Sequence, residues 1–160
     1  MSEWKTQFLK DDNWKAGWSL DEHTIKSTLL PGGGFDTEHT ELGKLINEIK
    51  YHNAKNKIKP LVNILCDSMK TLHVTKWLKV IIPVPPSNTE REFQPVLEIA
   101  DSLGKELKIP VCKDCVLKTK KTDYMKNKTE VERKELLSGI FKVKNNFIKN
   151  KKVLLFDDIY

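Results

Sequence analysis

Long apolar runs, glycine and proline are all scarce in this chain of 160 residues. No stretch approaches the roughly 18 consecutive apolar residues that a membrane-spanning helix needs, so a helical span is excluded. The 7 glycines and 7 prolines are far too few for a collagenous or low-complexity sequence. The segment Met1 to Asp12 mixes charged and aromatic side chains without an apolar stretch, so we expect no secretory signal and a cytoplasmic protein. The length fits one domain with its own core.

Cysteine is also scarce, with Cys66, Cys112 and Cys115 in the whole chain. An odd count without a secretory signal predicts reduced thiols. Cys112 and Cys115 form a CxxC motif, but a zinc site needs a second pair or suitably spaced histidines. All four histidines lie upstream and form no such pair. We therefore expect neither a zinc site nor redox chemistry at this motif, and interpret the two cysteines as small residues near a strand.

Net charge is absent from residues 1–100 and concentrated in 101–160. Residues 1–100 hold 13 basic and 13 acidic side chains, whereas residues 101–160 hold 15 and 9, which accounts for the net charge of +6. The densest part is 113–134, with eight basic and four acidic groups. Such a segment attracts nucleic acid, phosphorylated small molecules or acidic lipids, and a solvated lysine-rich surface is the simplest alternative.

Helical periodicity begins after residue 36. Thr37 is the expected N-cap of a first helix, whose apolar stripe consists of Leu42, Leu45, Ile46 and Ile49. A second helix is expected with Pro60 in its first turn, and its apolar positions are Ile58, Leu61, Val62, Leu65 and Met69. Residues 1–35 lack a clean period and are expected to form a cap.

Strands and helices alternate from residue 79 onward. The apolar run 80–84 predicts a strand buried on both faces, and 153–156 predicts a second buried strand. Weaker strand candidates are 108–111, 116–117 and 141–143. Capping boxes at 89–92 and 129–132 predict helices, the second of which ends at 138–139. This alternation predicts an α/β fold with a parallel sheet.

Two strand ends carry the candidate site, because open α/β sheets bind ligands beyond the carboxyl ends of their strands. Residues 85–88 form a rigid turn that leads toward a helix N-terminus, where backbone N–H groups could bind an anion. Asp157 and Asp158 directly follow the last strand, and adjacent side chains on a strand point to opposite faces. Two carboxylates there suit sugar hydroxyls or Mg²⁺, and an ordinary polar strand end is the alternative.

The segment Val153-Leu-Leu-Phe-Asp-Asp-Ile-Tyr160 resembles the first half of the phosphoribosyl-pyrophosphate (PRPP) motif of type I phosphoribosyltransferases. Over residues 14–160, further segments resemble the ComF-like, competence-associated branch of that family, in the family's order. They are Gly17-Trp-Ser-Leu-Asp-Glu-His-Thr24, Glu41-Leu-Gly-Lys-Leu45, Lys50-Tyr51, Ile82-Pro-Val-Pro-Pro86, Arg91-Glu-Phe-Gln-Pro95, Arg133 and Gly139-Ile-Phe-Lys-Val143.

The resemblance implies a three-layer, Rossmann-like core over 76–160 and an N-terminal hood over 1–75 that sets acceptor specificity. It implies that Asp157 and Asp158 bind the ribose hydroxyls of PRPP. The pyrophosphate loop would consist of Pro85, Pro86, Ser87 and Asn88, and a mobile basic loop would contain Lys118, Lys120, Lys121 and Lys126. Mg²⁺ would bridge the pyrophosphate, which leaves when an unidentified acceptor attacks the anomeric carbon.

Two departures from the family qualify this expectation. Many ComF-like proteins carry an N-terminal four-cysteine zinc element, which this sequence lacks. The second half of the PRPP motif, which grips the 5′-phosphate, is also absent after Tyr160. We therefore expect this chain to bind PRPP poorly and not to turn it over.

Three other interpretations stay open from the sequence. The basic region 113–152 could bind nucleic acid or a protein partner without catalysis. The two aspartates could hold a metal in a hydrolase or kinase, although no GxxxxGK[ST] loop is present. A sheet with an uncovered edge could also pair with a second copy or with a partner chain.

Overall fold

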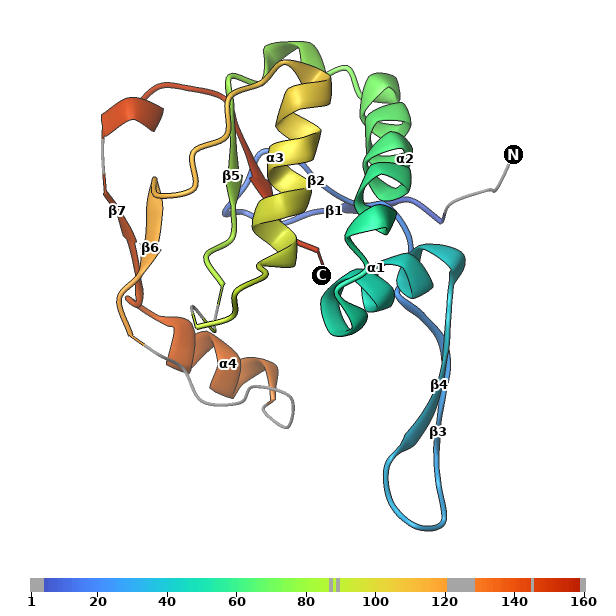
Figure 1. Ribbon diagram of the computed structural model, residues 1–160. Helices are drawn as coiled ribbons and strands as arrows, with labels where there is room; N and C mark the ends of the chain where they lie inside the picture. The colour runs from blue at the N-terminus through green and yellow to red at the C-terminus, as the bar shows by residue number, and fades with distance from the viewer. Residues whose placement is uncertain (1–4, 87, 89, 121–128, 145, 159–160) are drawn as a thin grey trace. The chain divides into compact units, whose positions relative to one another are not determined.

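The computed structural model describes residues 5–86, 88, 90–120, 129–144 and 146–158 (Figure 1). The chain divides into two compact units, the first formed by Met1–Leu72 with Asp158–Tyr160 and the second by His73–Asp157. Within the described residues, four α-helices combine with two-stranded sheets, one of which is parallel. A mixed α/β class is therefore confirmed. No helix in these ranges is long and apolar enough to cross a membrane.

Two antiparallel hairpins occupy the N-terminal segment in which the sequence shows no clean period. They are β1 (Gln7–Leu9) with β2 (Gly17–Ser19), and β3 (Thr24–Leu29) with β4 (Phe35–His39). Gly33 and Gly34, at φ +83° and +90°, turn the chain between β3 and β4, a conformation that glycine adopts without steric cost. Most side chains of β3 and β4 are exposed, so no alternation of buried and polar residues marks these strands.

Helix α1 (Glu41–His52) has a different N-cap from the one predicted. The cap is Thr40, whose side-chain oxygen accepts a hydrogen bond from the backbone N–H of Gly43 at 2.9 Å. Thr37 lies instead in β4, opposite Ser27, because the hairpin continues up to the helix. The predicted apolar stripe is confirmed, and its buried members are Leu42, Ile46 and Ile49.

The second predicted helix is confirmed as α2 (Ile58–Thr71), which follows the short helix η1 (Lys55–Lys57). Pro60 lies in its first turn, where the missing N–H has no helical partner to lose. The apolar face is buried, and its members are Leu61, Val62, Cys66 and Met69.

The second unit is built around β5 (Val80–Pro83), whose residues are all buried. β5 pairs in parallel with β8 (Val153–Phe156), with Val80 opposite Val153. On the other side of β5, Ile81 forms a parallel bridge with Val111. Of the weaker strand predicted at 108–111, only this single bridge is observed in the described residues. This parallel pairing is the arrangement that the alternation of strands and helices predicts.

The prediction that β8 is a buried strand is wrong for one of its faces. Val153 and Leu155 are 39% and 61% exposed, whereas Leu154 and Phe156 are half-buried. Alternate residues of a strand share a face, so one face of β8 meets solvent. A short continuous apolar run does not reveal how many faces of a strand are covered.

Helix α3 (Pro95–Leu107) begins later than the capping box at 89–92 predicts. Gln94 is the N-cap and is extended, at φ −112° and ψ 93°. Proline disfavours helical geometry in the preceding residue and is itself favoured at the first helical position. Pro95 therefore overrides the capping pattern. The buried face of α3 includes Ile99, Ala100 and Leu103.

The remaining predicted elements of the second unit are confirmed. β6 (Val116–Lys118) pairs antiparallel with β7 (Phe141–Val143). Between them lies α4 (Glu130–Leu137), which starts with a capping box. Thr129 donates its backbone N–H to the Glu132 carboxylate at 2.7 Å and accepts the Glu132 N–H at 3.3 Å.

Candidate functional site

The carboxyl ends of β5 and β8 lie side by side at one edge of the parallel pair, which we call the β5–β8 edge. Pro83 is opposite Phe156, and the Val84 N–H donates to the Phe156 carbonyl at 2.8 Å. Asp157 directly follows β8, and the 85–88 turn follows β5. The structure therefore brings together two segments that the sequence predicts as parts of one site, although they lie far apart along the chain.

The turn after β5 is held by local hydrogen bonds rather than by a helix. Asn88 accepts the N–H of Glu90 at 2.9 Å through its side chain, and its carbonyl accepts from the Gln94 side chain at 2.8 Å. Pro85 and Pro86 are half-buried. Because α3 starts only at residue 95, the prediction that this turn leads directly into a helix N-terminus is wrong. Ser87 lies outside the described residues.

The two aspartates that follow β8 lie in different environments. Asp157 is exposed. The side chain of Asp158 is only 7% exposed, and its carboxylate lies 3.1 Å from the ammonium nitrogen of Lys50, which is itself 20% exposed. A nearly covered carboxylate needs such a partner, because an isolated buried charge is strongly unfavourable. The two aspartates are therefore not equivalent, as expected for neighbours on a strand.

Two histidines of the first unit belong to the surroundings of this ion pair. The rings of His23 and His39 meet edge to face, with centroids 4.7 Å apart, and the His23 carbonyl lies 3.3 Å from His39 Nδ1. Burial lowers the pKa of His23; the neighbouring charges of His39 and Lys50 lower it further, while Asp158 opposes them. His23 Nε2 is covered and has no hydrogen-bond partner among the described residues. Burial and the missing hydrogen-bond partner at Nε2 both favour the neutral form of His23.

Lys50 is the residue that sequence reasoning missed. It lies in the last turn of α1 and meets Asp158 across 108 positions of sequence. Periodicity and capping patterns report only neighbours along the chain, so they carry no signal for this pair. The only hint is that Lys50-Tyr51 is one of the segments that resemble the ComF-like branch, and that resemblance assigns it no role.

The predicted mobile loop is only partly described. Lys118 is the last residue of β6, so it belongs to a strand and not to a loop as predicted. Partial burial lowers the pKa of Lys118 below its usual value. Lys120 is exposed just beyond the strand, whereas Lys121 and Lys126 lie outside the described residues.

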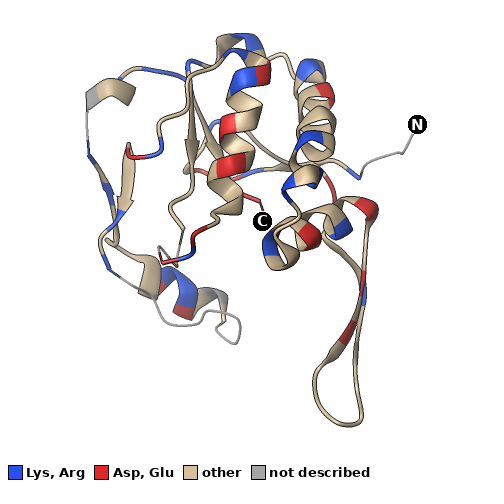
Figure 2. Ribbon diagram, in the orientation of Figure 1, with Lys and Arg blue, Asp and Glu red and all other residues tan. Residues whose placement is uncertain are grey.

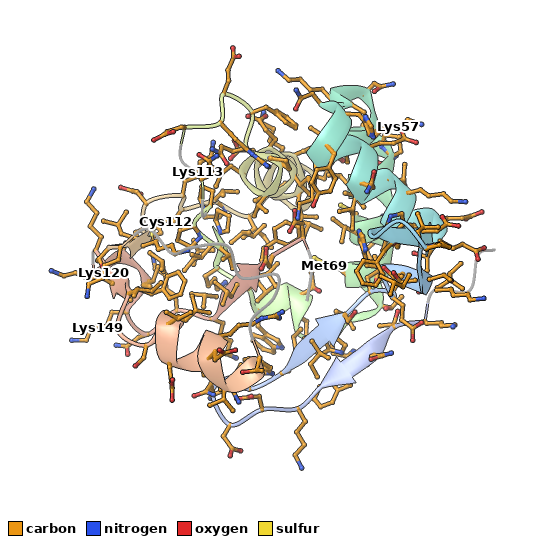
Figure 3. The ribbon with its side chains drawn as sticks, turned by 90° about the horizontal axis from the view of Figure 1, so that it is seen from below. Lys57, Met69, Cys112, Lys113, Lys120 and Lys149 are labelled. Carbon is orange, nitrogen blue, oxygen red and sulfur yellow. A yellow bond between two sulfur atoms is a disulfide. The ribbon has the colours of Figure 1, made fainter. Side chains whose placement is uncertain are left out.

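Cys112 and Cys115 form a disulfide, so the prediction of reduced thiols is wrong for this pair. Their Cα atoms are 5.5 Å apart, the usual spacing for a disulfide. Cys115 is fully buried and packs with Val80 and Ile82, whereas Cys112, labelled in Figure 3, is half-buried at the margin of this cluster. Cys66 is buried and takes no part in this disulfide.

In the described parts of the chain, no three histidine, cysteine or acidic side chains are grouped so as to hold a metal ion. A Mg²⁺ ion at the β5–β8 edge would therefore depend on substrate oxygens as well as on protein carboxylates, which is its common mode of binding. No protein-family model, curated protein or solved structure matches the chain. The candidate site accordingly stands on its geometry.

Proposed function

We propose that the β5–β8 edge binds PRPP, and that the chain is a phosphoribosyltransferase-like protein with a three-layer, Rossmann-like core. One observation carries the proposal: β5 and β8 pair in parallel, so the described residues that follow them, Pro85 and Pro86 after β5 and Asp157 after β8, lie at the same sheet edge. Ligands of open α/β sheets bind at this edge. The resemblance of 153–160 to the PRPP motif supplies the identity of the ligand.

In this proposal different residues of the chain bind different parts of PRPP. The exposed carboxylate of Asp157 accepts hydrogen bonds from ribose hydroxyls, as a charged acceptor does strongly. The 85–88 turn faces the pyrophosphate, and the basic segment that begins at Lys120 would offset its charge. In the transfer reaction that the resemblance implies, an acceptor displaces pyrophosphate at the anomeric carbon, which requires an oriented sugar and the exclusion of water.

Mg²⁺ fits this arrangement, because it is commonly held by one or two carboxylates together with substrate phosphates. Among the described residues, Asp157 provides a carboxylate that is exposed to solvent at this edge. When bound, the ion would neutralise charge on the departing pyrophosphate. Asp158 has a different role in the proposal, because its carboxylate is held by Lys50. It positions the chain after β8, since the Lys50 ammonium nitrogen lies within 3.3 Å of both of its oxygens.

An NMR titration tests the proposal directly. Backbone amides of ¹⁵N-labelled protein are followed while PRPP with excess Mg²⁺ is raised to about 10 mM, a range that detects binding free energies of only about 3–4 kcal/mol. We expect shifts at Val84, Asn88 and Asp157. Pyrophosphate alone should shift the amide resonances of the turn after β5 and leave that of Asp157 unchanged. Ribose 5-phosphate should shift the amide resonance of Asp157 and leave those of the turn unchanged.

The matched variants are Asp157→Asn and, as a control, Asp67→Asn, which removes an exposed carboxylate from α2. Asp157→Asn should weaken Mg²⁺–PRPP binding about tenfold or more, because it removes a charge-assisted hydrogen bond worth up to about 3 kcal/mol. The control should bind like the wild type. An absence of shifts at the three amides, or equal binding by both variants, would show that the edge is not a PRPP site.

A further inference from the structure

Two segments of the second unit contain lysines and no acidic residue. Residues 73–79 include Lys76 and Lys79, and residues 142–153 include five lysines. Figure 2 shows blue and no red along the coloured ribbon from β7 to the start of β8. The segment 113–134 differs, since it mixes basic with acidic groups and Lys113 forms an ion pair with Asp101.

The structure joins these two segments at the amino ends of β5 and β8. The N–H of Lys79 donates to the carbonyl of Lys152 at 2.9 Å, immediately before Val80 pairs with Val153. The short helix η2 (Thr75–Trp77) ends just before β5, and the ammonium nitrogen of Lys152 lies 4.7 Å from the centre of the Trp77 ring. Segments that are distant in the sequence therefore form one surface.

Aromatic rings are interleaved with the lysines on this surface. Lys76 also approaches the Trp77 ring, at 5.4 Å from its centre. Next to η3 (Asn146–Ile148), the ammonium nitrogen of Lys151 lies 3.2 Å from the centre of the Phe147 ring. Trp77 and Phe147 are 53% and 48% exposed, unusually open for such large apolar side chains. The surface thus offers flat apolar faces beside positive charge.

Among the residues that the structure describes, none of the lysines at positions 76, 79, 149, 151 and 152 forms an ion pair. Elsewhere lysines do find acidic partners, as Lys144 does with Asp114 at 3.7 Å. The positive charge of this surface is therefore not compensated from within the protein. Such a surface attracts a polyanion from solution.

We infer that this surface, which we call the lysine–aromatic face, binds single-stranded nucleic acid. Its members are Lys76, Trp77, Lys79, Phe147, Lys149, Lys151 and Lys152. Bases stack on exposed aromatic rings, and ammonium groups contact the phosphates between them, which is how single strands are bound without sequence preference. In a duplex the base faces are stacked inside the helix, so a duplex can contact the lysines but cannot stack on the aromatic rings.

The lysine–aromatic face is separate from the proposed PRPP site. It lies at the amino ends of β5 and β8, whereas the β5–β8 edge lies at their carboxyl ends. Four residues of extended strand span about 13 Å, so a strand of nucleic acid on one edge leaves the other accessible. The two proposals can therefore fail independently.

Fluorescence anisotropy with a labelled 12-nucleotide oligothymidylate tests the inference at several salt concentrations. We expect dissociation constants in the micromolar range at low salt, and weaker binding to a duplex of equal length. Because each phosphate contact in a single strand adds about 0.7 to the log–log salt slope, the Lys149→Gln/Lys152→Gln variant should reduce the slope by about 1.4. The Lys10→Gln/Lys15→Gln variant removes the same charge from the first unit and should change neither the slope nor the affinity.

Stacking is tested by Trp77→Leu, with Tyr51→Leu as the control for loss of another exposed aromatic ring. Loss of a stacking ring should weaken binding at least about fivefold and leave the salt slope unchanged. Nucleic acid should quench tryptophan fluorescence in the wild type and much less in Trp77→Leu. Circular dichroism confirms that each variant is folded.

Two results would overturn the inference. Equal weakening by the two lysine pairs would mean that net charge alone attracts the oligonucleotide. Equal affinity for polyglutamate of similar charge, with no effect of Trp77→Leu, would assign the face to acidic protein partners instead.

Discussion

The Lys50–Asp158 ion pair gives the sharpest test of the structure. Replacing Lys50 with methionine keeps an unbranched side chain of similar length and removes the charge. Asp158, only 7% exposed, is then left without the ammonium group 3.1 Å away. We expect the variant to be clearly less stable than the wild type.

The magnitude follows from distance and burial. At 3.1 Å two unit charges attract by about 1 kcal/mol in water and by about 5 kcal/mol at an effective dielectric constant of 20. Removing one partner of a buried pair costs about 3–5 kcal/mol, mainly through the charge that is left behind. Lys50 keeps 20% exposure, so water can partly solvate the remaining carboxylate. We therefore expect the free energy of unfolding to fall by about 2–3 kcal/mol, at or just below the lower end of the range for fully buried pairs.

Urea unfolding followed by circular dichroism measures this loss. The chain contains its own control, because Lys70 and Asp67 form a pair at 2.9 Å in which both side chains are more than two-thirds exposed. Lys70→Met should cost less than about 0.5 kcal/mol, since exposed pairs contribute little. The Lys50→Met/Asp158→Asn double variant should recover at least about 1 kcal/mol relative to Lys50→Met, because no buried charge remains.

The reasoning would be refuted if Lys50→Met and Lys70→Met cost the same. It would also be refuted if the double variant were no more stable than Lys50→Met. Salt offers an independent check, because about 0.5 M NaCl should erase the effect of Lys70→Met and leave most of that of Lys50→Met.

Two further predictions concern the surroundings of this pair. Gly43→Ala should destabilise the chain by about 1–3 kcal/mol, because a Cβ there would overlap the backbone oxygen of His23. In the control Gly32→Ala the added Cβ meets open space, so the cost should be less than about 0.5 kcal/mol. Thermal unfolding of both variants measures the two losses in stability. The pKa of His23 is lower in the folded chain than the 6.5 of an unfolded histidine, so its contribution should be constant above about pH 7 and fall as the pH drops through 6.5 toward the folded-state pKa. The difference in unfolding free energy between wild type and His23→Gln, measured from about pH 5 to 8, should show this fall. A flat difference would show that His23 is equally easy to protonate in both states.

The sequence predicts elements well where one local signal dominates. The stripe in α1 and the Thr129–Glu132 capping box correspond to the helices observed. At residue 89 a similar capping pattern failed, because Pro95 determines where α3 can start. Two local signals competed there, and the steric restriction of proline prevailed.

Elements without a burial pattern, and contacts between residues distant in sequence, could not be predicted from the sequence. The β3–β4 hairpin exposes most of both faces, so no burial pattern marks it. For the candidate site, the sequence indicated the turn after β5 and the aspartates after β8, because strand ends are local features. It could not reveal that Lys50 covers Asp158, since that contact depends on how the first unit folds.

The two strand pairings of β5 close chain segments of different length. The segment from Ile81 to its partner Val111 is less than half as long as the segment from Val80 to its partner Val153. For flexible loops that difference costs about 0.8 kcal/mol more entropy, so we expect β5, α3 and Val111 to associate before β8 joins them. Hydrogen exchange should then protect the amide of Ile81, which donates to Pro110, more strongly than the amide of Val84, which donates to Phe156 of β8, and equal protection would contradict this order. Asp157 reaches the β5–β8 edge only when β8 docks. A chain that has formed its core but not yet added that last strand is therefore compact and without a site.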